Sequence, residues 1–273
     1  MISQKLDSLD DISQYIVTRK LDAFEPPHKQ KVHYIDMELL LGMTLNNTDV
    51  VLNLSNSYYR SPNSSESQVM RSSIIGVANS LAKLVDRFGT RLINFSSYFQ
   101  NLSDASQSGA KEYTLFKSEA AYILETACQS SKSVLDDLYL YDNYGGSRRS
   151  TIFYLMLDSF LTKKDLSISF PLQTINLLHC RDIADAIAKL IEAPIYPYTT
   201  KRISKYDISS TVDFSLLELS HMISQFADFD SRITYSANVY RFELPHAHPR
   251  LPFLQEGVVL QNYIEEYFRF LRN

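Results

Sequence analysis

The chain has 273 residues, of which 45% are hydrophobic and 21% charged, as is typical of a soluble globular protein. That length suffices for one large α/β domain, or for a main domain with a small lobe. The net charge of −4 gives no reason to expect nucleic acid or a membrane surface as the main partner. No apolar run has the length of a membrane span, and no signal-peptide pattern opens the sequence. Because the lone cysteines Cys128 and Cys180 also suit a reducing compartment, we expect a cytoplasmic protein.

Short apolar strands alternate with amphipathic helices through the first part of the sequence. Strands are expected at residues 15–18, 32–35, 49–54, 92–95, 138–141 and 166–170, and helices at residues 37–43, 69–88, 117–129, 151–161 and 182–192. Residues 142–146 are expected to form a turn. Gly89 is the expected C-cap of the long helix before it. This alternation is typical of right-handed βαβ units and a parallel sheet. We therefore predict an α/β protein with a Rossmann-like, doubly wound parallel sheet.

The pattern changes after residue 193. The elements expected there are a strand at residues 206–208, helices at residues 216–226 and 258–271, and a strand near Ile233. They predict a small α/β lobe rather than a second sheet domain. The expected domains are thus residues 1–193 and residues 194–273.

Candidate chemistry is concentrated between Arg91 and Lys117. A short apolar strand ends on the hydroxyls of Ser96 and Ser97, and after a polar loop Tyr113 and Lys117 follow at the start of a helix. Their spacing of four places both on one helix face, where an ammonium favours the phenolate form of a nearby tyrosine. With a serine hydroxyl, the pair could exchange a proton with a substrate oxygen as an alcohol and a carbonyl interconvert. A buried tyrosine with a solvated lysine is the alternative.

The Ser-Ser pair after a strand, followed by Tyr-x-x-x-Lys, resembles the extended short-chain dehydrogenase/reductases. Within them it is most similar to the NAD-dependent epimerase/dehydratase group, which acts on nucleotide sugars. Further segments resemble motifs of that group in the same order: residues 49–55, 73–79, 142–146, 176–184 and 254–258. The resemblance implies that Ser97 (less favourably Ser96), Tyr113 and Lys117 are catalytic. It also implies that Ser55 ends the strand beside the nicotinamide ribose.

The front of the family pattern is absent. Such dinucleotide binders begin with a strand and a Gly-x-x-Gly-x-x-Gly turn at the pyrophosphate, whereas the first glycine here is Gly42. The resemblance places Arg19 and Lys20 at the adenosine ribose, where they favour NADP over NAD, and Asp36 at the adenine. The alternative for Arg19 and Lys20 is a solvated basic pair after a strand, and the alternative for Asp36 is a plain turn at a strand end. We expect this chain alone to bind NAD or NADP weakly or not at all, unless it lacks its true N-terminus.

Two arginines are candidate contacts for a substrate diphosphate. Arg148 follows the glycines of residues 145–146, and Arg250 lies in a proline-rich segment, where its fork of donors would suit a diphosphate. A solvated helix start is the alternative for Arg148, and an ordered surface loop for the segment around Arg250. The histidines show no metal-ligand spacing, so no metal site is expected.

The resemblance implies an NAD(P)-dependent enzyme that reduces or epimerises a nucleotide-linked 4-keto, deoxy sugar. The alternative is a catalytically degenerate relative, which keeps the fold without the cofactor and serves as a scaffold or partner subunit. Related proteins often pair through the helices expected at residues 69–88 and 117–129. The sequence does not fix the oligomeric state, and a homodimer or pairing with another subunit are both open.

Overall fold

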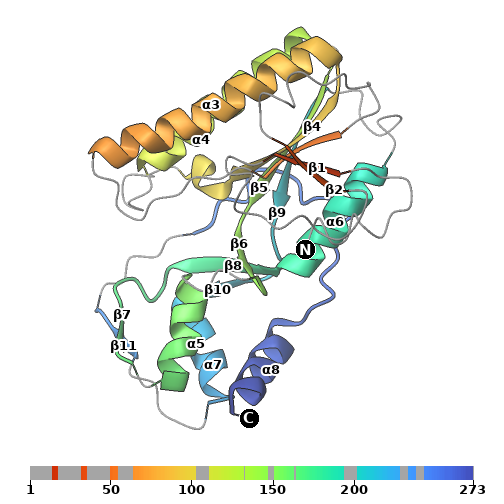
Figure 1. Ribbon diagram of the computed structural model, residues 1–273. Helices are drawn as coiled ribbons and strands as arrows, with labels where there is room; N and C mark the ends of the chain where they lie inside the picture. Colours follow the sequence, from red (N-terminus) through yellow and green to blue (C-terminus); the bar gives the residue numbers. More distant parts are fainter. Residues whose placement is uncertain are drawn as a thin grey trace. The chain divides into compact units, whose positions relative to one another are not determined.

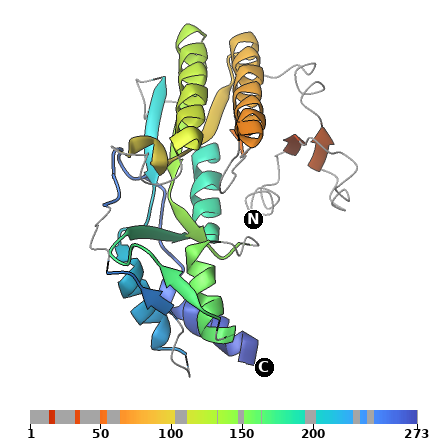
Figure 2. The same cartoon turned by 90° about the vertical axis from the view of Figure 1, so that its left-hand side faces the viewer.

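The computed structural model describes residues 14–17, 32–35, 50–54, 64–102, 111–131, 133–146, 151–162, 164–193, 202–227, 233–237 and 243–272. The chain forms two compact units, each built from separate stretches of sequence. Unit 1 comprises Met1–Leu140, Ile187–Asp207 and Ala247–Pro249, and unit 2 comprises Tyr141–Ala186, Ile208–His246 and Arg250–Asn273. The expected division at residues 193 and 194 follows chain order and stays a prediction. Figures 1 and 2 show the elements in two views.

Unit 1 contains a four-stranded sheet in the order β3-β4-β5-β9. Its strands are β3 (Val50–Asn53), β4 (Arg91–Ser97), β5 (Val134–Leu140) and β9 (Ile203–Ile208). Strands β3 and β5 both run parallel to β4. The predicted parallel arrangement of the segments near residues 50, 92 and 138 is therefore confirmed. Strand β9 lies beyond residue 193 and still belongs to this sheet.

Two long helices, α3 (Ser64–Phe88) and α4 (Lys111–Ser130), pack side by side in unit 1 (Figures 1 and 2). Their shared core includes Met70, Ile74, Leu81, Leu84, Val85, Phe116, Leu124 and Cys128, together with Leu92 and Leu135 of the sheet. Helix α3 ends as predicted, because Gly89 has a φ of 66° and its N–H donates to the Val85 carbonyl oxygen at 2.9 Å. This packing places one face of α4 against the sheet.

Near the start of the chain, β1 (Gln14–Val17) and β2 (Val32–Ile35) pair in parallel. Within the described residues, no strand hydrogen-bonds this pair to the sheet that begins at β3. The helix expected at residues 37–43 lies outside the described residues.

Unit 2 contains a three-stranded sheet in the order β10-β8-β6. Its strands are β6 (Asp142–Tyr144), β8 (Thr174–His179) and β10 (Asp213–Ser215). Residues 142–144 belong to the segment interpreted from sequence as a turn, and that interpretation was wrong for them because they pair in parallel with Leu177–His179. A second, two-stranded parallel sheet joins β7 (Leu166–Ile168) to β11 (Ile233–Tyr235).

The helices of unit 2 are α5 (Ile152–Thr162), α7 (Leu216–Ser224) and α8 (Leu260–Arg272), whose apolar faces share one core. Helix α6 (Cys180–Glu192) begins in unit 2 and ends in unit 1. Among the helices that the structure describes, none combines the length and hydropathy needed to cross a membrane.

Candidate active site

The adjacent hydroxyls at the end of β4 have different surroundings. Ser96 Oγ donates to Asp137 Oδ1 at 2.7 Å. Ser97 caps the short 3-10 helix η2 (Tyr98–Asn101): its Oγ accepts from the Phe99 N–H at 3.4 Å, while its own N–H donates to Gln100 Oε1 at 2.8 Å. Both serines are buried. The hydroxyl proton of Ser96 is therefore committed to a carboxylate, which favours Ser97 as the serine that could donate to a substrate.

Tyr113 and Lys117 lie in the first two turns of α4, on its buried face. Their exposed fractions are 6% and 7%. Lys117 Nζ donates to the carbonyl oxygen of Phe95 at 2.8 Å, so the amine lies over the carboxyl end of β4, two residues before Ser97. The alternative of a solvated lysine is therefore wrong. Both side chains and Ser97 belong to unit 1.

The surroundings of Lys117 control its charge. Burial lowers its pKa to about 8, and the negative charge of Asp137 opposes that fall. With a pKa near 8 the amine is mostly protonated at pH 7, yet it can lose its proton within an accessible pH range. A buried ammonium of this kind can stabilise a phenolate or hydrogen-bond a sugar hydroxyl.

Sequence reasoning missed the polar array beneath this site. Asp137 Oδ1 accepts from Asn94 Nδ2 at 2.7 Å as well as from Ser96, and Asn94 Oδ1 accepts from Asn53 Nδ2 at 2.7 Å. The array therefore runs across β3, β4 and β5. Its signal in the sequence is the pair Asp136-Asp137 inside an otherwise apolar strand, since buried carboxylates require partners.

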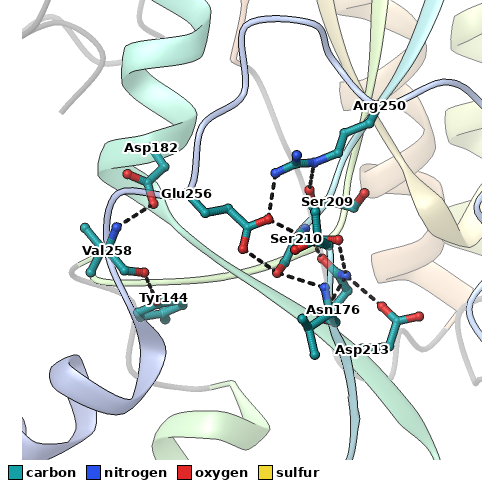
Figure 3. A network of polar contacts seen from close by, with 11 residues as sticks. Tyr144, Asn176, Asp182, Ser209, Ser210, Asp213, Arg250, Glu256 and Val258 are labelled. Carbon is teal, nitrogen blue, oxygen red and sulfur yellow. Dashed lines mark hydrogen bonds and ion pairs between the residues drawn. The ribbon is translucent and has the colours of Figure 1, made fainter.

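Arg250, the predicted diphosphate contact, forms part of a network within unit 2 (Figure 3). Its Nη2 pairs with Glu256 Oε1 at 2.7 Å, and its Nε donates to the Ser209 carbonyl oxygen at 2.8 Å. Glu256 also accepts from Ser210 Oγ and from the Thr211 N–H, both at 2.7 Å. Arg250 is thus oriented by a carboxylate while a third of its side chain is exposed.

Asn176 of β8 holds the same loop from the other side. It is fully buried, and its Nδ2 donates to the Ser210 carbonyl oxygen at 3.0 Å and to Asp213 Oδ1 at 2.7 Å (Figure 3). Its Oδ1 accepts from the Ser210 N–H at 2.6 Å. A single amide therefore fixes the backbone of the loop that contacts Glu256.

The remaining predicted site residues, Arg19, Lys20, Asp36, Ser55 and Arg148, lie outside the described residues. In the part of the chain that the structure describes, no group of three or more His, Cys, Asp or Glu side chains could hold a metal ion.

Solved structures show how widely the fold is shared. The UDP-glucose 4-epimerase of Thermotoga maritima, solved with UDP-glucose, is 12% identical, with a TM-score of 0.73 over 100% of this chain and 97% of its own. The UDP-N-acetylglucosamine 4-epimerase of Methanobrevibacter ruminantium is 14% identical, with a TM-score of 0.70 over 100% of this chain and 95% of its own. The dTDP-glucose 4,6-dehydratase of Bacillus anthracis, solved with NAD, is 12% identical, with a TM-score of 0.70 over 99% of this chain and 91% of its own.

No protein-family model and no curated protein matches the sequence. The class is therefore defined by the fold: this chain has the Rossmann-like fold of nucleotide-sugar epimerases and dehydratases. The predicted fold class is confirmed, and the resemblance inferred from the sequence is confirmed at the level of the fold.

Proposed function

We propose that the chain is an NAD(P)-dependent enzyme of the epimerase, dehydratase or reductase type, acting on a nucleotide-linked 4-keto, deoxy sugar. The observation that carries this proposal is the placement of Lys117, buried and anchored to the Phe95 carbonyl oxygen one helical turn after Tyr113. Ligands of doubly wound sheets bind outside the carboxyl ends of the strands, where Ser97 ends β4. The structures that share the fold were solved with UDP-glucose, UDP-N-acetylmuramic acid or NAD.

The described residues fit the nicotinamide end of such a cofactor. Lys117 offers a buried ammonium, β3 ends at Asn53, and Ser55, two residues further on, is the proposed contact at the ribose. Arg19 and Lys20 are proposed contacts at the adenosine end, with a preference for NADP over NAD, and Asp36 is proposed at the adenine. When bound, the cofactor supplies or accepts the hydride.

In the proposed mechanism the protein controls the proton. Tyr113 exchanges a proton with the oxygen on the reacting sugar carbon, and the Lys117 ammonium stabilises the phenolate that forms. Ser97 donates a hydrogen bond to the same oxygen. Because all three side chains are buried, few waters would compete for these contacts.

Arg250 and Arg148 are proposed to contact the diphosphate of the substrate. Arg250 uses its Nε and one Nη2 donor within unit 2, and a guanidinium carries five donors in all. Its exposed fraction of 33% leaves this edge accessible to an anion. Replacement of Arg250 by Gln should raise KM for the nucleotide sugar more than it lowers kcat.

A second candidate function is a scaffold or partner subunit that keeps the fold without the cofactor. It is favoured by the interruption between β1–β2 and the sheet that begins at β3, within the described residues. Among the residues that the structure describes, no strand pairs with both β1 and β3 and leads into a glycine turn at the pyrophosphate.

Calorimetric titration of the purified chain with NADH and NADPH separates the two candidates. The enzyme proposal expects micromolar binding and, with oxidised cofactor present, conversion of a UDP- or dTDP-linked sugar detected by chromatography. Absence of cofactor binding together with absence of conversion across both nucleotide series would refute it and support the scaffold.

A further inference from the structure

The turn that follows β4 is held by the side chain of Gln100. The N–H of Ser97, the last residue of β4, donates to Gln100 Oε1 at 2.8 Å. Gln100 is the third residue of η2, so its side chain reaches back to the strand that precedes the turn. This contact is one half of a capping box, in which a glutamine or glutamate accepts from the N–H of the N-cap residue. The backbone of Ser97 is thus fixed by a side chain from beyond the strand.

The hydroxyl of Ser97 is oriented from within the same turn. Its Oγ accepts from the Phe99 N–H over a long distance of 3.4 Å. That contact uses a lone pair of the oxygen, so the hydroxyl proton stays available for a substrate oxygen. The neighbouring Ser96 differs, because its Oγ donates to Asp137 Oδ1 at 2.7 Å. Ser97 is therefore the hydroxyl of this pair whose direction is set while its proton is kept.

Aromatic packing holds the middle of the turn. Tyr98 is 4% exposed, and its ring stacks on that of Phe99, with the centroids 4.3 Å apart and an angle of 25° between the ring planes. The Phe99 side chain packs against the core that α3 and α4 share with the sheet. Since the two aromatic residues are anchored by their rings, the contact with Gln100 is what remains to fix the backbone at Ser97.

We propose that Gln100 is a positioning residue for Ser97, and that its side-chain oxygen fixes the point from which the Ser97 hydroxyl donates to the reacting sugar oxygen. The proposal rests on the proposed function, because that function gives Ser97 its role. A donor acts on a reacting oxygen only from the correct position, and a displacement of about 1 Å can cost about 100-fold in rate.

The first test compares two replacements of Gln100 in the full chain. Gln100→Glu keeps an oxygen acceptor, because glutamate also completes a capping box, whereas Gln100→Met keeps the length of the side chain and removes the acceptor. Gln100→Met should lower kcat for sugar conversion by about 10- to 100-fold with little change in KM, and Gln100→Glu should stay within about 3-fold of the parent. A Gln100→Met enzyme as fast as the parent would overturn the proposal, and Gln100 would then only cap η2.

A double-mutant cycle shows whether Gln100 acts through the Ser97 hydroxyl. Ser97→Ala removes the hydroxyl and keeps the N–H that donates to Gln100. In the Ser97→Ala background, Gln100→Met should therefore lower kcat little further, because the two losses are not additive when one residue acts through the other. An equal loss in both backgrounds would overturn the proposal, since Gln100 would then act on another group.

The last measurement involves no catalysis. Hydrogen exchange of the Ser97 amide is followed by NMR without cofactor or substrate. Exchange should be about 10-fold faster in Gln100→Met than in the parent, as expected for the loss of one hydrogen bond, and close to parental in Gln100→Glu. Equal exchange in all three proteins would overturn the proposal.

The parent alone decides if Gln100→Met does not fold. A Ser97 amide that exchanges in the parent as fast as an exposed amide would show that Gln100 does not hold it. Failure of the proposed function would appear separately, as a parent that neither binds NADH or NADPH nor converts a nucleotide sugar. Amide exchange would still report in that protein whether Gln100 fixes Ser97.

Discussion

Lys117 Nζ lies 2.8 Å from the carbonyl oxygen of Phe95, which joins the second turn of α4 to the strand that ends in Ser97. A carbonyl acceptor orients the amine without neutralising it. Tyr113, one turn earlier on the same helix, is thereby held at a fixed distance along the axis from the ammonium. This hydrogen bond thus ties α4 to β4 within unit 1.

The first prediction concerns Tyr113. Removal of its hydroxyl in Tyr113→Phe should lower kcat for sugar conversion by about 10²- to 10⁴-fold, the usual contribution of a positioned proton donor. Tyr122→Phe is the control, since Tyr122 lies on the same helix and is 72% exposed. Rates are measured by chromatography of the nucleotide sugars, with circular dichroism to verify folding. A Tyr113→Phe enzyme as active as the parent would remove Tyr113 from the mechanism.

The second prediction compares two arginine–carboxylate pairs. The side chains of Arg91 and Asp136 are 7% and 5% exposed. In Arg91→Met, Asp136 loses its ion-pair partner, and the Leu190 carbonyl oxygen loses the donor that lies 2.7 Å away. We expect a loss of about 3–5 kcal/mol in the free energy of unfolding. Arg71→Met breaks the exposed pair with Glu119 and should cost less than about 1 kcal/mol. Urea unfolding measures both, and similar losses would contradict the argument.

The first two strands of the main sheet were predictable from their apolar residues. Val50, Val51 and Leu52 are consecutive in β3, and Leu92, Ile93 and Phe95 lie close together in β4. Short apolar segments of this kind are typical of strands in a parallel sheet. Strand β6 was missed because Asp142–Tyr144 has only three residues next to a glycine pair, and its identity as a strand depends on pairing with β8. Short strands of this kind are decided by tertiary contacts, which local sequence does not contain.

The candidate site was predictable only in part. The Tyr113–Lys117 spacing is a local property of a helix, so both residues share a face as expected. The burial of Lys117 depends on α4 packing against β4, and the role of Asp137 depends on three strands aligning Asn53, Asn94 and Asp137. Those contacts join residues that are 22, 41 and 43 positions apart, beyond the reach of spacing arguments.

The third prediction concerns Gly145. Its φ is 85°, and an added Cβ would lie 2.1 Å from His179 Nε2. Gly145→Ala should therefore lower the free energy of unfolding by more than about 1 kcal/mol. Gly76, inside α3, is the control: nothing lies within 4 Å of its added Cβ, so Gly76→Ala should stabilise by about 0.5–1 kcal/mol. Chemical unfolding of the two variants should therefore give changes of opposite sign.

The fourth prediction concerns pH and His179. Burial lowers the pKa of this imidazole, and its Nδ1 accepts from the Arg181 N–H at 3.1 Å, which requires the neutral ring. The unfolded chain then binds more protons than the folded chain below about pH 6.5. The contribution of His179 to stability should thus be present above that pH and be lost as the pH falls below it.

The measurement is urea unfolding at several pH values between 7.5 and 5. The difference in unfolding free energy between the parent and His179→Gln should shrink as the pH falls. His221 lies on the exposed side of α7. The unfolding free energy of His221→Gln should therefore differ from that of the parent by the same amount at each pH. A difference for His179→Gln that is constant with pH would show that the ring makes no titrating contribution.

The side chain of Asn176 in β8 holds the backbone of the neighbouring loop at Ser210. The loop backbone at Ser210 is held by this amide, whereas Thr211 and Val212 project their side chains into solvent. The outward residues of the loop can therefore diverge over evolutionary time without changing its path. Mutation of Asn176 would release Ser210, and with it the carboxylate of Glu256 that orients Arg250. The path of this loop therefore depends on Asn176, a residue of β8, more than on the loop's own exposed side chains.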